Sequence, residues 1–238
     1  MKQKIVVFTG AGISAESGIK TFRDSDGLWE EYNIYEVATP MAWNKNKELV
    51  LEFYNKRRKQ AMEAQPNKAH EALKKLEEKY EVTIITQNID DLHERAGSTV
   101  VIHLHGEIKK SRSTVDETLI YTINGSELKL GDVCEKGSQL RPHIVWFGEQ
   151  VPMMERAYEV TAQANVLIVV GTSLLVYPAA GILTYAPDDI PKYLIDPNEM
   201  NPAGVKNLSI LKQKATVGLP ALVERLLEEG IQGEGKEL

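Results

Sequence analysis

The strongest constraint on this chain is a glycine-rich turn that follows an apolar run near its N-terminus. The run Ile5-Val6-Val7-Phe8 has the length and β-branched content of a buried strand, and it leads into Thr9-Gly10-Ala11-Gly12-Ile13-Ser14. Gly10 and Gly12 would let the backbone approach a phosphate closely, and the helix that follows would offer unpaired N–H groups to the anion. The turn therefore predicts a phosphate-binding unit, although an ordinary tight turn explains the pattern about equally well.

The spacing to the next strand separates this chain from a standard dinucleotide-binding unit. In that unit the second strand follows within about 30 residues and ends near an acidic residue that binds the ribose. Here the next convincing strand is at 82–86, after a polar turn at 24–27 and a mixed aromatic stretch at 28–35. The sequence therefore predicts a cofactor loop and helical segments between the first two strands, and it disfavours a dehydrogenase.

The other apolar runs predict an α/β fold. They alternate with helical or loop segments and lie at 100–104, 166–170 and 193–195. This pattern is typical of a Rossmann-like doubly wound parallel sheet that is covered on both faces. Helices are predicted at 47–63 and 66–79. The second helix has an apolar stripe of Ala69, Ala72, Leu73 and Leu76.

The predicted domain boundaries follow from a change of pattern. Between Gly106 and Pro142 the sequence has short alternating segments, turns and many Lys and Ser residues, which predict a small β-rich inserted lobe. We expect one structural unit with a large domain at 1–36, 64–105 and 149–228, and a small lobe at 37–63 and 106–148. Residues 229–238 are polar and predict a flexible tail.

Composition restricts the expected partners. The 238 residues carry a formal net charge of −6, so we expect no nucleic-acid binding through bulk charge. The sequence has no apolar stretch of about 18 residues and no signal-peptide pattern, so we expect a cytoplasmic protein that does not enter membranes. The single cysteine, Cys134, excludes an intrachain disulfide and a cysteine-rich metal site. A monomer is favoured.

Polar side chains follow the predicted strand at 82–86. Ligands of open α/β sheets bind outside the carboxyl ends of the strands, where Gly10 also lies. Gln87, Asn88 and Asp90 exceed what a helix cap needs, so we expect them to face a bound ligand. The turn Gly171-Thr172-Ser173 follows another buried run and is expected on the same side.

Two histidines end the predicted strand at 100–104. Alternation places His103 and His105 on one face, and together with His93 they could chelate a metal ion, but no further ligand cluster is evident. The ordinary pKa of histidine suits removal of a hydroxyl proton at neutral pH. We therefore favour His105 as a general base beside a bound cofactor.

Five motifs, in this order and across nearly all of residues 4–228, resemble the sirtuin family of NAD-dependent protein lysine deacylases. They are Gly-Ala-Gly-Ile-Ser with Thr-Phe-Arg, Thr-Gln-Asn-Ile-Asp, His-Gly-Glu, Val-Trp-Phe-Gly-Glu and Gly-Thr-Ser. The resemblance implies a catalytic role for His105 with Asn88 and Asp90. It implies an NAD site made of Gly10, Ala11, Gly12, Ile13, Ser14, Glu16, Phe22, Arg23, Gln87, Asn88, Ile89, Asp90, Gly171, Thr172, Ser173, Asp196, Asn198 and Ala215.

The resemblance also implies that NAD is consumed as a co-substrate. The acyl oxygen of a modified lysine would attack the anomeric carbon of the nicotinamide ribose, and His105 would help to deprotonate a ribose hydroxyl. The products would be the deacylated lysine residue, nicotinamide and an acyl-ADP-ribose. The expected partner is an acylated lysine in a protein or peptide, clamped as an added strand by Val145, Phe147, Gly148 and Glu149.

One pair of residues bears on the acyl group. Tyr54 and Arg57 are spaced i and i+3 in the helix predicted at 47–63, so they project from one face. Sirtuins that are specialised for acidic acyl groups have a Tyr-x-x-Arg pair there, and Ala15 resembles the same subgroup. A guanidinium can bind a carboxylate bidentately. We therefore expect removal of succinyl and malonyl groups, with deacetylation secondary.

The chain departs from the family in its small lobe. Sirtuins usually bind a structural zinc ion through two Cys-x-x-Cys pairs, but residues 106–142 contain only Cys134, with Ser111 and Ser113 where the other pair would lie. One thiolate cannot complete a tetrahedral site. We therefore expect no zinc, and a lobe held by its own packing, including Leu119, Tyr121 and Leu128.

Three other functions remain as alternatives. They are an NAD- or ADP-ribose-binding module without turnover, a mono-ADP-ribosyltransferase, and a metal hydrolase that uses His93, His103 and His105. The presence of His105, Asn88 and Asp90 together argues against a module that only binds.

Overall fold

A six-stranded parallel sheet forms the centre of the molecule, with the strand order β11-β10-β9-β1-β4-β5. Its strands are β1 (Lys4–Thr9), β4 (Glu81–Thr86), β5 (Val101–His103), β9 (Val166–Val170), β10 (Lys192–Ile195) and β11 (Leu208–Leu211). The chain builds outward from β1 in one direction through β4 and β5, and in the other through β9, β10 and β11. This is the doubly wound order that was predicted, and its reversal point lies between β1 and β9.

The computed structural model describes residues 2–20, 28–29, 32–172, 174, 179–198, 202 and 204–231. Its helices are α1 (Ala11–Ala15), α2 (Ile34–Val37), α3 (Pro40–Lys45), α4 (Lys47–Glu63), α5 (Lys68–Leu76), α6 (Leu92–Arg95), α7 (Met154–Thr161), the 3-10 helix η2 (Ala179–Tyr185) and α8 (Ala215–Glu229). No helix among these residues is both long enough and apolar enough to span a bilayer.

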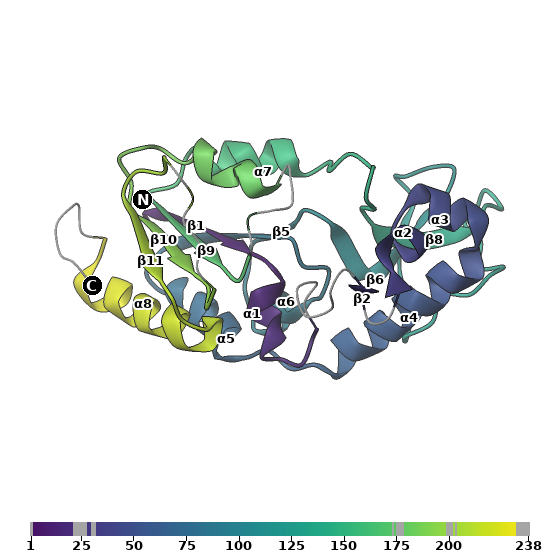
Figure 1. Ribbon diagram of the computed structural model, residues 1–238, viewed down its shortest axis with the longest axis horizontal. Coiled ribbons are helices and arrows are strands. Elements are labelled where there is room, and N and C mark those ends of the chain that lie inside the picture. Colours follow the sequence, from purple (N-terminus) through teal and green to yellow (C-terminus); the bar gives the residue numbers. More distant parts are fainter. Residues whose placement is uncertain are drawn as a thin grey trace.

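Helices cover both faces of the sheet (Figure 1). On one face α5 and α8 pack against Ile5, Val7 and Ile84 in a shared core. On the other face Val6, Phe8 and Leu167 pack with residues of α7 and η2. Because successive side chains of a strand point to opposite faces, β1 contributes to both cores and is buried from Ile5 to Thr9. This explains why the parallel strands have continuous apolar sequences.

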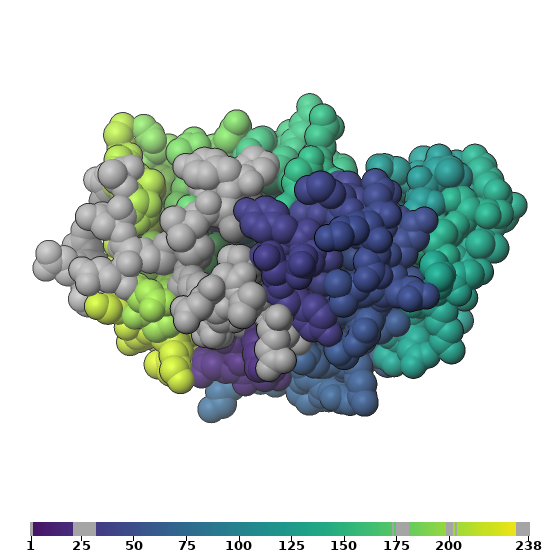
Figure 2. All heavy atoms as spheres, turned by 45° about the vertical axis from the view of Figure 1, so that its right-hand side comes forward, coloured from purple at the N-terminus to yellow at the C-terminus, as the bar shows by residue number. Residues whose placement is uncertain are grey.

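The second body is the small lobe. Its sheet has the order β7-β6-β8, made of β7 (Ile120–Thr122), β6 (Gly106–Ser113) and β8 (Leu140–Ile144). A separate two-stranded pair, β2 (Leu28–Trp29) and β3 (Tyr32–Asn33), precedes α2 in the sequence. Figure 2 shows the dark blue residues of α2 to α4 packed directly against the teal residues of the lobe. One core joins them, with Phe53, Ile108 and Trp146 among its members.

The predicted elements and the observed ones agree closely, with small shifts at their ends. The helix predicted at 47–63 is α4. The helix predicted at 66–79 begins at Lys68, because Asn67 accepts a hydrogen bond from the N–H of Ala69 and caps it. Of the tail predicted at 229–238, Glu229 belongs to α8 and Gly230, with φ of 81°, follows the helix, while residues 232–238 lie outside the described residues.

Candidate active site

The glycine turn lies where β1 and β9 diverge. A Cβ built on Gly12 would lie 2.6 Å from the Cα of Gly171, and one built on Gly10 would lie 2.7 Å from the Cβ of Thr172. The N–H of Gly12 donates to the carbonyl of Gly171 at 2.8 Å. Backbone therefore packs against backbone at the reversal point of the sheet, which is where dinucleotides bind in doubly wound folds. The turn fits NAD in this respect.

The variant Gly171→Ala tests this close packing. Gly171 has φ of 62°, and its added Cβ would lie 2.5 Å from the nitrogen of Ile13. Strain and overlap should lower the free energy of unfolding by about 2–4 kcal/mol and weaken NAD binding. Urea denaturation and calorimetric titration with NAD measure the two effects. In the control Gly181→Ala the new Cβ meets no atom within 4 Å, so stability should hold; equal stability of both variants would contradict the packing argument.

A buried polar network supports the turn from behind. The Asn88 amide donates to the carbonyl of Gly10 and to the Ser14 hydroxyl, both at 3.1 Å, and that hydroxyl donates to Asp90 at 3.1 Å. The Gln87 amide donates to the Thr172 hydroxyl at 2.9 Å. The structure thus joins residues from β1, β4 and β9 that the sequence predicted to meet.

Asp90 and His105 are ionisable groups near the turn whose pKa values are shifted in opposite directions. Burial raises the pKa of Asp90, while the N–H of Leu92 and the Ser14 hydroxyl oppose the rise. Nδ1 of His105 lies 3.0 Å from the carbonyl oxygen of Gln87. A carbonyl accepts only, so Nδ1 carries the hydrogen and Nε2 is the basic nitrogen. Burial lowers the pKa of His105, against the effect of the Gln87 carbonyl, which favours the neutral base at physiological pH.

Residues predicted at the adenosine half lie at the ends of β10 and α8. Asp196 is buried and accepts from both the N–H and the amide of Asn198, at 2.9 and 3.0 Å. The Glu16 carboxylate accepts from the hydroxyl and the N–H of Thr216 at the first turn of α8. Ala215 is buried at the start of α8. These contacts bring α1, β10 and α8 to one side of the turn.

Two residues predicted in the NAD site have side chains that pack against a hydrophobic core, and three others lie outside the described residues. The Ile13 side chain is buried in the core under the sheet, so only its backbone can face a ligand. Ile89 packs against the core of the small lobe. Phe22, Arg23 and Ser173 lie outside the described residues.

The pair predicted to bind the acyl group lies inside the small lobe. Tyr54 and Arg57 are 1% and 7% exposed, on the inner face of α4. Burial raises the pKa of Tyr54 well above its ordinary value, and Trp146 and the charge of Arg57 partly oppose the rise. The phenol, the guanidinium and the indole of Trp146 are therefore close neighbours. A helix pair that is a surface feature in most proteins is here buried beside the segment that follows β8.

The segment after β8 is tied to both bodies. The N–H of Val145 donates to the carbonyl of His105, and the N–H of Phe147 donates to the carbonyl of Ala38, both at 3.0 Å. Phe147 is 46% exposed. The segment thus connects the sheet end that carries His105 with the loop between α2 and α3.

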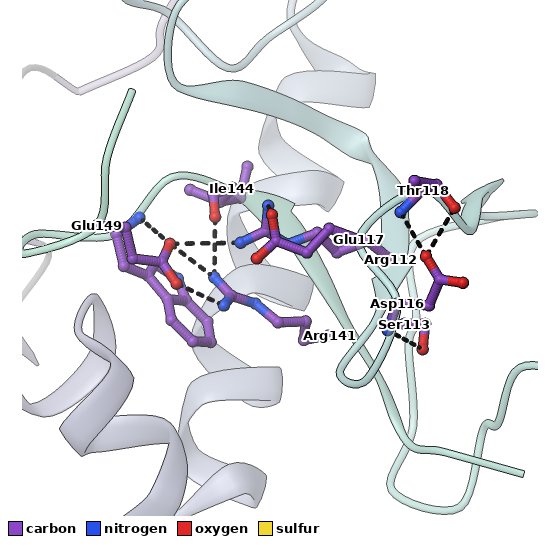
Figure 3. A network of polar contacts seen from close by, with 9 residues as sticks. Arg112, Ser113, Asp116, Glu117, Thr118, Arg141, Ile144 and Glu149 are labelled. Atoms are coloured by element: carbon purple, nitrogen blue, oxygen red, sulfur yellow. Dashed lines mark hydrogen bonds and ion pairs between the residues drawn. The ribbon is translucent and has the colours of Figure 1, made fainter. Parts of the chain in front are cut away.

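Glu149 lies at the centre of an ion-pair network (Figure 3). Its carboxylate accepts from Arg141 at 2.6 and 3.1 Å, from Arg112 at 3.5 Å and from the N–H of Trp146 at 2.8 Å. The Arg141 guanidinium also stacks on the Trp146 ring at 3.3 Å. These contacts show Glu149 fixing the turn at 146–149; its predicted contact with a peptide stays a prediction.

Comparison with known proteins decides the family. Residues 10–178, more than half of the chain, match the Sir2 family. The chain belongs to the Sir2 family. An NAD-dependent protein deacylase of Helicobacter pylori is 52% identical over 226 residues, which are 95% of this chain and 98% of the relative. The sirtuin chain is accordingly an NAD-dependent protein deacylase with NAD as its co-substrate.

Solved sirtuin structures share its fold. A crystal structure of a Sir2 homologue in complex with NAD matches with a TM-score of 0.85 and 39% identity, over 96% of this chain and 91% of that chain. A Sir2 protein with a deacetylated p53 peptide and 3'-O-acetyl ADP-ribose matches with a TM-score of 0.78 and 32% identity, over 97% and 95% of the two chains. The sirtuin fold predicted from the motifs is therefore confirmed.

Hydrogen bonds and ion pairs occupy the region of the small lobe where other sirtuins usually carry their zinc cysteines. Cys134 donates to the Ser113 hydroxyl at 3.3 Å, and Lys136 pairs with Asp116 at 2.7 Å. Leu128 is buried, and the Tyr121 hydroxyl donates to Glu135. In the described part of the chain, no three His, Cys, Asp or Glu side chains are grouped so that they could hold a metal ion. The absence of zinc stays a prediction.

The structure also shows what the histidines of the metal-hydrolase alternative contact. His93 is buried with Nε2 at 3.1 Å from the Thr9 hydroxyl, and His103 contacts Glu94 and the backbone of Asn88. Each ring is thus engaged by protein groups of its own.

Sequence reasoning missed several supporting residues of this sirtuin site. Asn67 donates to the carbonyl of Ile13 at 2.8 Å and to the Ser17 hydroxyl at 2.9 Å, so it anchors α1 to α5. Glu94, which contacts His103, and Arg141, which donates to Glu149, are two more such residues. The one available signal for Asn67 was its position directly after Pro66, at a predicted helix start.

Proposed function

We propose that this sirtuin removes succinyl and malonyl groups from protein lysine in preference to acetyl groups. The single observation that supports the preference is the burial of Tyr54 and Arg57 together on the inner face of α4, next to Trp146. Both residues come from the helix that packs against β6 and β8. A cation in this position faces the segment that is predicted to hold the substrate peptide.

The chemistry of the acyl groups explains the preference. A succinyl or malonyl group ends in a carboxylate, which the guanidinium fork can bind through two parallel hydrogen bonds, with a further one from the Tyr54 hydroxyl. An acetyl group ends in a methyl, which offers no charge to a guanidinium that has been removed from water. Charge-assisted hydrogen bonds are worth about 1.5–3 kcal/mol each. The acidic acyl groups should therefore bind more strongly.

The proposed roles in the reaction follow from the geometry around the turn. When bound, NAD would supply the ribose that loses nicotinamide and receives the acyl group on one of its hydroxyls. Gly10 and Gly12 let the backbone approach it, and Asn88 and Asp90 hold the turn and its ligand in place. His105 takes a hydroxyl proton on Nε2, because Nδ1 is committed to the carbonyl of Gln87.

The experiment compares one lysine peptide in acetyl, malonyl and succinyl forms, with NAD. We expect nicotinamide release with all three, and kcat/KM for the succinyl and malonyl peptides at least about tenfold above that for the acetyl peptide. Mass spectrometry should find the acyl group on ADP-ribose and no ADP-ribose on protein. Equal or higher efficiency on the acetyl peptide would refute the preference while leaving deacylation intact.

A further inference from the structure

Two histidines near the end of β5 make the same kind of backbone contact, and His103 has a second, charged partner. Nδ1 of His103 lies 3.0 Å from the carbonyl oxygen of Asn88, and Nδ1 of His105 lies 3.0 Å from that of Gln87. Nε2 of His103 also lies 2.7 Å from a carboxylate oxygen of Glu94. Carbonyl and ionised carboxylate oxygens only accept hydrogen bonds. His103 can therefore satisfy both partners only with a hydrogen on each nitrogen.

We propose that Glu94 and His103 form a positioning pair for the deacylation centre, in which Glu94 keeps His103 as an imidazolium that holds the carbonyl of Asn88. The pair rests on the proposed roles of His105, Asn88 and Asp90. Neither member contacts the reacting atoms in this assignment. A neutral His103 has one N–H and can donate to only one of its two acceptors, so loss of the proton frees either Asn88 or Glu94.

The pair bears on both groups that face NAD. Asn88 carries the amide that holds Gly10 and Ser14, so release of its carbonyl loosens the support of the turn. Asp90 is 5% exposed, and the positive charge of His103 is one of the influences that favour its ionised form. An imidazolium at this position therefore holds the backbone of Asn88 and stabilises the negative charge of Asp90.

The titratable groups around His103 come from α6, from the loop before it and from β6. Glu94 and His93 lie on α6, Asp90 precedes α6, and Glu107 and Lys110 lie on β6, where they pair with each other at 2.7 Å. Burial lowers the pKa of His103, but the hydrogen bond and charge of Glu94 outweigh burial, and Glu107 adds to them, so the pKa is raised. Burial and the charge of His103 lower the pKa of His93, which keeps that ring neutral.

Protonation of His105 should then limit activity at low pH, and loss of the proton from His103 should limit it at high pH. His105 must be neutral, and its lowered pKa keeps it neutral to lower pH than an ordinary histidine. His103 must be charged, and its raised pKa keeps it charged above the ordinary value of about 6.5. The expected profile of kcat/KM against pH is a bell, with His105 on the acidic limb and His103 on the basic limb.

The variant Glu94→Gln separates positioning from mere packing. It should move the basic limb to lower pH, so that the variant matches the wild type on the acidic side of the profile and is roughly tenfold slower on its basic side. The acidic limb should stay in place. Loss of packing alone would slow the reaction by the same factor at every pH, and that result would overturn the proposal.

Titration of the imidazole signals by NMR provides a test that needs no turnover. The pKa of His103 should exceed about 6.5 in the wild type and fall in Glu94→Gln, while that of His105 stays unchanged. The matched control Glu107→Gln removes a charge that makes no hydrogen bond to His103, so it should shift the pKa less. A wild-type His103 that titrates below about 6.5 would overturn the pair even if Glu94→Gln does not fold.

The two kinds of failure are distinguishable. If the wild type releases no nicotinamide from any acyl peptide, the proposed function fails, and the NMR titration still decides whether the pair exists. If the wild type turns over and the basic limb of Glu94→Gln does not move, the pair fails and the proposed function stands.

Discussion

His105→Ala is expected to lower the rate of deacylation by about 10²- to 10⁴-fold, which is the usual contribution of a positioned general base. The reason is local: burial lowers the pKa of His105, and the Gln87 carbonyl fixes which nitrogen takes the proton. The affinity for NAD should change little, because the glycine turn and the Asn88 network do not depend on this imidazole. Nicotinamide release measures the rate, and calorimetric titration measures the affinity.

A second histidine provides the control for that experiment. His143 lies on β8 and is also partly buried, with its pKa lowered by burial. Because His143 takes no part in the polar network around the turn, His143→Ala should retain close to the wild-type rate. An unaltered rate in His105→Ala would remove the assigned role of His105, and a joint loss of NAD binding would point instead to damage of the turn.

Arg57→Met should raise KM for the succinyl peptide by about 10- to 100-fold, because it removes charge-assisted hydrogen bonds worth about 1.5–3 kcal/mol. Methionine replaces the apolar stem of arginine without its guanidinium, and its flexible side chain adapts to the space, so the packing of α4 should be largely retained. KM for the acetyl peptide should change far less, since its methyl group makes no hydrogen bond to the guanidinium. Initial rates on the two peptides, with NAD at saturation, provide the comparison.

Two further variants test how the carboxylate of the acyl group is bound. Arg57→Lys keeps the charge but loses the bidentate fork, so it should recover only part of the succinyl activity. Tyr54→Phe loses a single hydroxyl from the same buried face and should have the smaller effect. If Arg57→Met raised KM equally for both peptides, the assignment of the acyl pocket would be wrong.

The sequence predicted well those features that depend on local pattern. Continuous apolar runs such as 166–170 became fully buried strands, because a parallel sheet is covered on both faces. The stripe at Ala69, Ala72, Leu73 and Leu76 became the buried face of α5, because residues three and four apart share one side of a helix. Gly10 and Gly12 were recognisable because few other demands on the backbone need glycine at that spacing.

The features that the sequence did not predict depend on contacts between distant segments. Asn67 holds Ile13 from 54 positions away, and Arg58 is buried with its Nε donating to the carbonyl of Ile108, 50 positions away. Nothing in the local pattern distinguishes these side chains from solvated ones. Glu149 illustrates the same limit: the motif placed it beside the substrate, while its carboxylate is engaged by Arg141 and Arg112.

The hydrogen bond from Val145 to the carbonyl of His105 couples two tasks that are usually separate. Val145 begins the segment that is proposed to hold the peptide, and His105 is the proposed base. A peptide that displaces this segment also displaces the base, so a poor fit should slow turnover as well as weaken binding. Selection among protein substrates would then appear in kcat, and peptides of equal affinity would differ in the rate at which they are processed.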